Sequence, residues 1–215
     1  YASREMGRLY ETEKYLHNYG LTYALGLTKA PYANLAQVPR YQEDLNKVNE
    51  QGVYVTPAYP LRYSFAFSTF KMANVAYYNF TPQISSNQVV FGRAKELAPE
   101  SMFQFFVLSE HELDLPRWIR LGKWMAKARV EVKVQRSAVT KQGSYRADGA
   151  LNPLDLSLLP ETCNIVAMAP ASLITNVHYT GSYYELNYDE DGRSHTIRLP
   201  TNMYYQPERT KRLFA

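Results

Sequence analysis

The chain has 215 residues and a mass of 24.8 kDa; 46% of the residues are hydrophobic and 20% are charged. This composition is typical of a folded globular protein and excludes an intrinsically disordered one. The net charge is +4, and the single cysteine, Cys163, excludes an internal disulfide framework and a four-thiolate zinc site. The apolar runs are far shorter than the roughly 18 residues of a membrane-spanning helix. We therefore expect an intracellular, cytoplasmic protein that is not associated with a membrane.

The first predicted element is a helix over Arg8 to Leu27, because apolar residues recur there at helical spacings. Gly26 and Pro31 close this stretch in the way that helices commonly end. A polar connector follows up to residue 51, and part of it, from Tyr41 to Leu45, could form a short helix.

From Val53 onwards the composition favours strands. Residues 129–134 alternate strictly, so Val130, Val132 and Val134 are expected on a buried face of one of them. Residues 135–152 lack a hydrophobic period and are predicted to be a mobile loop. Residues 189–193 are predicted to form a hairpin turn. The remaining predicted strands cover residues 53–55, 63–67, 75–80, 89–91, 102–108, 164–168, 183–188 and 196–199. One or two helices with a mostly antiparallel sheet predict the α+β class.

The positive charge is concentrated in one block. Residues 117–146 contain nine basic residues and one acid, Glu131, so this block carries +8 while the rest of the chain carries −4. A local basic block on a mildly acidic protein indicates a surface that binds a polyanion. The alternative is a solvated face laced with salt bridges.

The common nucleotide-binding and hydrolase motifs are missing: the chain has no phosphate loop, no G-x-G-x-x-G, no H-E-x-x-H and no G-x-S-x-G. The four histidines are scattered. Glu13 and His17 could share a metal on one face of the predicted helix, or could simply form an exposed pair. We expect no metal centre and no cofactor.

Both tryptophans lie inside the basic block, interleaved with cations. Single-stranded RNA is bound by this combination, because cations neutralise phosphates while aromatic rings stack on bases. The alternative for each tryptophan is core packing. The cations follow a helix-like spacing of three to four residues and could therefore form one face. The candidate RNA-binding residues here are Arg117, Trp118, Arg120, Lys123, Trp124 and Lys127.

A second candidate is the segment Phe91 to Lys95, in which Gly92 precedes Arg93 and Lys95. A glycine before two cations, directly after a strand, would let the backbone approach a phosphate closely. The alternative is an ordinary turn at the end of a strand.

Four stretches of the chain resemble the Csc-one family, the Cas-five-type subunit of type I-D CRISPR Cascade complexes. They are LYETEKYLHNY (9–19), VYVTPA (53–58), FGRAKEL (91–97) and WIRLGKW (118–124). The matches keep their order and the resemblance spans about residues 2–135.

The resemblance implies a single RAMP-type domain over residues 1–215, with an RRM-like (ferredoxin-like) fold, an antiparallel sheet and an inserted thumb. The thumb would fall in residues 34–52 or 135–152. An RRM-like sheet begins with a strand before its first helix, and only Tyr1 to Gly7 precede the predicted helix. We therefore expect that an N-terminal strand is missing.

The resemblance also implies a function. The subunit would be non-catalytic and would cap the 5′ handle of the CRISPR RNA, next to the Cas-seven-type backbone subunit and the Cas-ten-like large subunit. Target DNA would be present in the same complex but would be read by guide pairing. Arg93, Lys95 and the residues of the basic block would contact the handle.

Two alternatives differ in class. Cas-five-type proteins of type I-C systems cut CRISPR repeat RNA without a metal, and here Tyr10, Lys14 and His17 could serve such an endoribonuclease. The other alternative is a general RNA-binding module unrelated to CRISPR.

Overall fold

The computed structural model describes residues 4–6, 9–29, 39–71, 91–122, 126–136, 138–190 and 192–209. Its helices are α1 (Asn18–Ala24), α2 (Tyr41–Glu50) and the short 3-10 helix η2 (Pro153–Asp155). Its strands are β1 (Arg4–Met6), β2 (Leu9–Glu11), β3 (Val53–Val55), β4 (Tyr59–Arg62), β5 (Phe65–Lys71), β6 (Phe91–Leu97), β7 (Met102–Gln104), β8 (Val107–Ser109), β9 (Trp118–Leu121), β10 (Ala126–Arg129), β11 (Val139–Arg146), β12 (Thr162–Val166), β13 (Leu173–Glu190) and β14 (Arg193–Pro200). This content confirms the α+β class.

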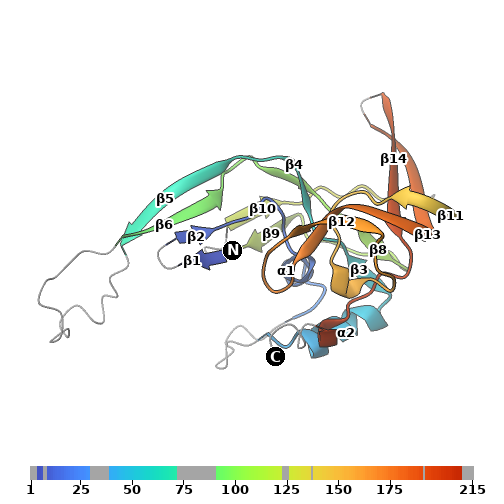
Figure 1. The fold of residues 1–215 in the computed structure, drawn as a ribbon, viewed down its shortest axis with the longest axis horizontal. Helices are drawn as coiled ribbons and strands as arrows, with labels where there is room; N and C mark the ends of the chain where they lie inside the picture. Colours follow the sequence, from blue (N-terminus) through green and yellow to red (C-terminus); the bar gives the residue numbers. More distant parts are fainter. Residues whose placement is uncertain are drawn as a thin grey trace, which may run out of the picture.

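The strands form several small sheets. One has the order β1-β2-β6-β5, and another has the order β11-β13-β12 with β14 paired to the far part of β13. Two-stranded pairs join β9 to β10, β3 to β8 and β4 to β7. Only the pairing of β2 with β6 is parallel among the described strands. Figure 1 shows β5 and β6 reaching away from the helices at one end of the molecule, and β13 with β14 projecting at the other.

The core lies between α2 and the sheet of β11, β13 and β14. Leu45 and Val48 on α2 are completely buried, because the helix places residues three apart on one face. They belong to one apolar cluster with Leu151 and Val177. A second, smaller cluster holds α1 against β3 and β9 through Leu21, Leu25, Val55, Ala58 and Ile119.

A buried carboxylate organises the centre of the fold. Asp155 is fully buried, and its Oδ2 accepts hydrogen bonds from the amides of Asn18 (2.7 Å) and Asn152 (3.0 Å) and from the hydroxyl of Tyr54 (3.2 Å). Its Oδ1 accepts from the Tyr19 hydroxyl at 3.0 Å. Burial raises the pKa of Asp155 to about 6, against the lowering effect of these hydrogen bonds. The network joins α1, β3 and η2, which are distant in sequence.

The predicted helix over residues 8–27 is wrong in its first half. Residues 9–11 form β2, and α1 begins only at Asn18. The parallel pairing of β2 with β6 overrides the local helical period. Two short strands therefore precede α1, where we expected that a strand was missing.

The predicted mobile loop at 135–152 is also wrong, because Val139–Arg146 within it form β11, which pairs with β13 along eight residues. The buried strand predicted at 129–134 is wrong as well, since β10 ends at Arg129 and Val132 and Val134 are more than half exposed. The hairpin turn between β13 and β14 is confirmed, with Gly192 at a φ of 73°. The strands predicted at 75–80 and 89–91 lie outside the described residues, except for Phe91.

Of the ranges considered for a thumb, 34–52 contains α2 and 135–152 contains β11. Both elements pack into the body of the fold. No helix in the described part of the chain has the length and apolar character needed to cross a membrane.

Candidate nucleic-acid interface

The antiparallel hairpin of β9 and β10 gathers part of the basic block on one surface. Arg120 lies directly opposite Lys127, and Trp118 lies directly opposite Arg129. Opposite residues in an antiparallel pair share a face, and so do residues two apart on one strand. Trp118, Arg120, Lys127 and Arg129 therefore form one surface, which we call the hairpin face.

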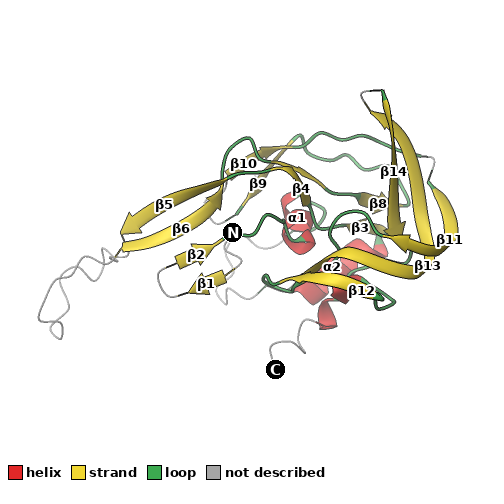
Figure 2. Ribbon diagram, turned by 45° about the horizontal axis from the view of Figure 1, so that its top comes forward, coloured by secondary structure: helices red, strands yellow, loops and turns green. Residues whose placement is uncertain are grey.

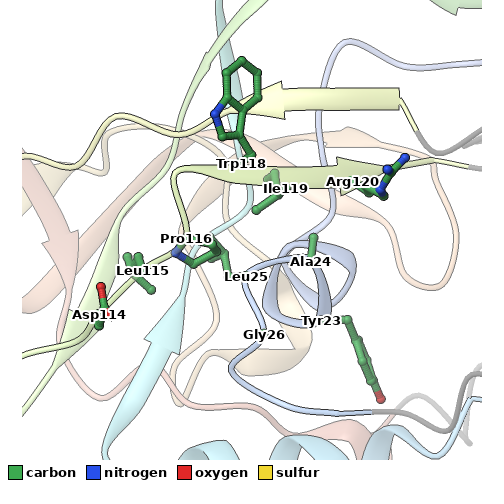
Figure 3. A pocket seen from close by; sticks show the side chains of 10 residues that line it. All are labelled: Tyr23, Ala24, Leu25, Gly26, Asp114, Leu115, Pro116, Trp118, Ile119 and Arg120. Carbon is green, nitrogen blue, oxygen red and sulfur yellow. The ribbon is translucent and has the colours of Figure 1, made fainter.

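The two faces of this hairpin differ sharply in burial. Ile119 is 5% exposed and packs in the cluster with Leu25 of α1, whereas Trp118 is 62% exposed. Figure 3 shows Ile119 directed toward α1 and Trp118 directed away from it. The alternative that Trp118 is a core residue is therefore wrong. The exposed indole therefore does not pack in the core as Ile119 does.

The helix-like spacing predicted for these cations is wrong, because they lie on strands. The period of two explains why Arg120 and Lys127 still meet, since both point outward from the same hairpin. It also adds Arg129, which the helical spacing missed. Arg129 forms an ion pair with Glu131, and its side chain is 67% exposed. The hairpin face thus combines three exposed cations with one exposed aromatic ring.

An open pocket lies on the side of the hairpin that faces α1. Its volume is about 620 Å³. It is bounded by the end of α1 and by the segment that leads into β9 (Figure 3). Its lining residues are Tyr23, Ala24, Leu25, Gly26, Asp114, Leu115, Pro116, Trp118, Ile119 and Arg120.

Arg93 and Lys95 lie on a different sheet. Both belong to β6, so Gly92 is inside a strand, and neither the loop nor the strand-end turn that we considered is present. The Lys95 ammonium lies over the Phe65 ring, 4.1 Å from its centroid. In the described part of the chain β6 pairs with β2 and β5, and not with β9 or β10. The structure therefore divides the predicted site residues between two surfaces.

The remaining predicted site residues are Arg117, Lys123 and Trp124. Arg117 is exposed just before β9, and its carbonyl accepts a hydrogen bond from the Val130 amide at 2.9 Å. Lys123 and Trp124 lie outside the described residues.

Two of the residues considered for RNA cleavage, His17 and Lys14, are held in other contacts in the structure. His17 is 4% exposed, and its Nδ1 accepts the backbone N–H of Tyr19 at 3.2 Å, which caps α1. Burial lowers the pKa of His17 to about 3, only partly offset by a hydrogen bond with the Ala171 backbone. The Lys14 ammonium lies over the rings of Tyr63 and Tyr15. A buried, neutral His17 is a structural residue and is not placed to act on a 2′-hydroxyl.

Metal binding finds no support in the described ranges. Glu13 precedes α1, so it does not share a helix face with His17, contrary to the predicted spacing. No group of three or more His, Cys, Asp or Glu residues is placed there to hold a metal ion.

The family model described as type I-D CRISPR-associated protein Cas5/Csc1 matches residues 1–208. No protein of curated function matches the chain.

Proposed function

Because the chain belongs to the type I-D CRISPR-associated Cas5/Csc1 family, we propose that it is a non-catalytic subunit of a type I-D Cascade complex that caps the 5′ handle of the CRISPR RNA. The hairpin face carries this proposal. It offers three cations for phosphates and one exposed indole for a base, which is the combination that binds unpaired RNA.

The proposed contacts follow from the geometry of the hairpin face. Arg120 and Lys127 are side by side, so they suit two neighbouring phosphates or one phosphate held from two sides. Trp118 lies on the same face and suits stacking on a base next to them. Arg117, Lys123 and Trp124 are further proposed contacts with the RNA.

The proposed partners are the Cas-seven-type backbone subunit, the Cas-ten-like large subunit and, within the complex, target DNA. We place the complex in the cytoplasm. The protein would hold the RNA and would leave reading of the target to guide pairing.

We further propose that the domain is of the RAMP type with an RRM-like core. The parallel pairing of β2 with β6 supports this, since it requires a crossover, and the intervening chain contains α1 and α2. A thumb within residues 34–52 or 135–152 stays a prediction.

An affinity pull-down tests the proposed function. The tagged chain is co-expressed with the neighbouring CRISPR subunits and a CRISPR array, and the bound RNA is run on a denaturing gel. We expect one discrete RNA of guide length, together with the backbone and large subunits at a fixed ratio. Recovery of the chain alone, or with RNA of mixed lengths, would contradict the proposal.

A preparation of the purified chain alone tests the enzymatic alternative. Purified chain is incubated with repeat RNA in the presence of EDTA, and we expect the RNA to remain intact. Cleavage by the wild-type chain that is lost in His17→Ala would overturn the non-catalytic assignment.

A further inference from the structure

The hairpin of β5 and β6 carries exposed aromatic side chains on one face. Phe67 is 74% exposed and Phe91 is 56% exposed, although each lies within a strand. Large aromatic residues are usually buried, and an exposed pair on one sheet face indicates a surface that binds something.

The register of the hairpin sets cations among these rings. Phe67 lies directly opposite Lys95, and Thr69 lies directly opposite Arg93. Residues two apart share a face, so Phe91, Arg93 and Lys95 point to the same side as Phe65 and Phe67. We call this surface of Phe65, Phe67, Phe91, Arg93 and Lys95 the aromatic face. Its residues include two cations, and Glu11 of β2 lies beside Lys95 on the same side of the sheet.

The opposite side of β6 is the less exposed one in the first half of the strand. Gly92 and Ala94 are buried there, and Ala94 is 8% exposed. The strand therefore has one closed face and one open face. Figures 1 and 2 show the β5–β6 hairpin extending away from both helices, so neither helix covers it.

We infer that the aromatic face is a second RNA-binding surface, on which Phe67 and Phe91 stack on unpaired bases while Arg93 and Lys95 contact phosphates. A row of cations between flat rings is complementary to a polyanion whose bases are exposed. Lysine is depleted at the core of protein–protein interfaces, so Lys95 among these rings favours a polyanion over a protein partner. The inference rests on the proposed function for the identity of the ligand as RNA.

Two neighbouring features modulate the charge and shape of this surface. Tyr63 lies just before β5, its ring is 5.5 Å from that of Phe65, and the Lys14 ammonium lies 5.3 Å from the Tyr63 centroid. These residues continue the alternation of rings and cations beyond the hairpin. Glu11 of β2 lies on the same side of the sheet as Lys95 and lowers the local positive charge. Glu11→Gln is therefore expected to tighten RNA binding.

The test separates ring stacking from apolar contact. The full chain is titrated with a short fluorescein-labelled oligoadenylate and with an abasic oligonucleotide of the same length and charge. The variant Phe67→Leu with Phe91→Leu keeps apolar side chains but removes the rings, and Phe67→Tyr with Phe91→Tyr keeps the rings. Leu159→Ala, at a residue that is 88% exposed, is the control for losing an exposed apolar group.

We expect the wild-type chain to prefer the oligoadenylate to the abasic probe by roughly tenfold or more, because stacking is lost without bases. With Trp118→Ala present in every variant, which removes the other ring proposed to stack on bases, the preference should disappear in the leucine pair and persist in the tyrosine pair and in the Leu159→Ala control. A leucine pair that binds both probes as the wild type does would overturn the inference. If in addition Phe67→Asp released another subunit from the complex, the aromatic face would be a protein-docking surface instead.

This titration uses the isolated chain, so its result is independent of the pull-down. A positive titration with a failed pull-down would leave the aromatic face in place and remove the Cascade role. A successful pull-down with equal binding of the two probes would keep the Cascade role and remove the aromatic face as an RNA-binding surface.

Discussion

Arg120 and Lys127 lie directly opposite each other across the β9–β10 hairpin, although both are cationic. Like charges at directly opposed positions destabilise an antiparallel pair. The arrangement becomes favourable once an anion lies between the two side chains. A phosphate of the proposed RNA ligand, held between the two side chains, would offset this repulsion.

The first prediction concerns salt dependence of RNA binding. Arg120→Ala with Lys127→Ala should weaken binding of guide-length RNA. The slope of log affinity against log salt should become less steep by about 1.4, if each cation contacts one phosphate of a single strand. Fluorescence titrations at several salt concentrations measure this slope. The control is Lys29→Ala with Lys47→Ala, which removes the same charge from exposed positions outside the hairpin. Equal slopes in the two double variants would contradict the assignment.

The second prediction uses two adjacent residues on opposite faces of β9. Trp118→Ala should lower RNA affinity about fivefold or more with little change in the free energy of unfolding, because the indole is exposed. Ile119→Ala should lower the free energy of unfolding by about 2–5 kcal/mol, because the side chain is buried. Urea denaturation and RNA titration on both variants test this. If Trp118→Ala lowered the free energy of unfolding and left RNA affinity unchanged, the tryptophan would be a packing residue and the prediction would be contradicted.

The third prediction concerns the buried network around Asp155. In Asp155→Asn one carboxylate oxygen becomes an amide that cannot accept from the donors around it, which include Asn18 and Tyr19. Leaving a buried donor without an acceptor costs about 1–3 kcal/mol, and more for a charged group. We expect a loss of about 3 kcal/mol in urea denaturation. Asp189→Asn, at an exposed carboxyl, is the matched control and should change stability little.

The fourth prediction concerns pH. The pKa of His17 falls from 6.5 to about 3 on folding, because burial disfavours the charged ring. Below pH 6.5 the unfolded chain binds a proton that the folded chain does not, so this contribution to stability is lost as the pH falls from 6.5 toward 3. His17→Asn keeps an acceptor for the helix cap but does not titrate. Between pH 7.5 and 5 the wild type should therefore lose about 2 kcal/mol more than this variant.

Asp155 acts in the opposite direction over part of this range. Its pKa rises from 3.8 to about 6 on folding, so its contribution is complete below pH 3.8 and is lost as the pH rises through 6. The comparison of the two chains removes this effect, because both contain Asp155. Parallel stability curves for the wild type and His17→Asn would contradict the depressed histidine pKa.

The α+β class and the basic block could be predicted from composition and periodicity, but the secondary structure of the block could not. The spacing of Arg117, Arg120, Lys123 and Lys127 fits a helix, and only the strand pairing sets Arg120 beside Lys127. The deciding signal was Gly122, which adopts a φ of 74° just after β9. A glycine within a short connection between two strands is a hairpin signal, and with it the period of two would have grouped Arg129 with Trp118.

Other features depend on contacts between distant parts of the sequence. Asn18 and Asp155 are 137 residues apart, and their hydrogen bond needs the whole fold to be in place. The aromatic face likewise depends on the register that sets Phe67 opposite Lys95. Local patterns carry no information on such registers. The predicted helix over 8–27 failed partly for the same reason, since β2 pairs with the distant β6 as well as with the adjacent β1.

The central claim is tested most directly by locating this chain on the RNA of the assembled complex. Guide-length RNA with a single photo-crosslinking uridine, placed either in the 5′ handle or near the 3′ end, is assembled with the full set of subunits and irradiated. We predict that the chain is crosslinked from the 5′ handle position and that Trp118→Ala with Arg120→Ala reduces this crosslink while the complex stays intact. Crosslinking from the 3′ position alone, or no crosslink to this chain from either position, would contradict the account.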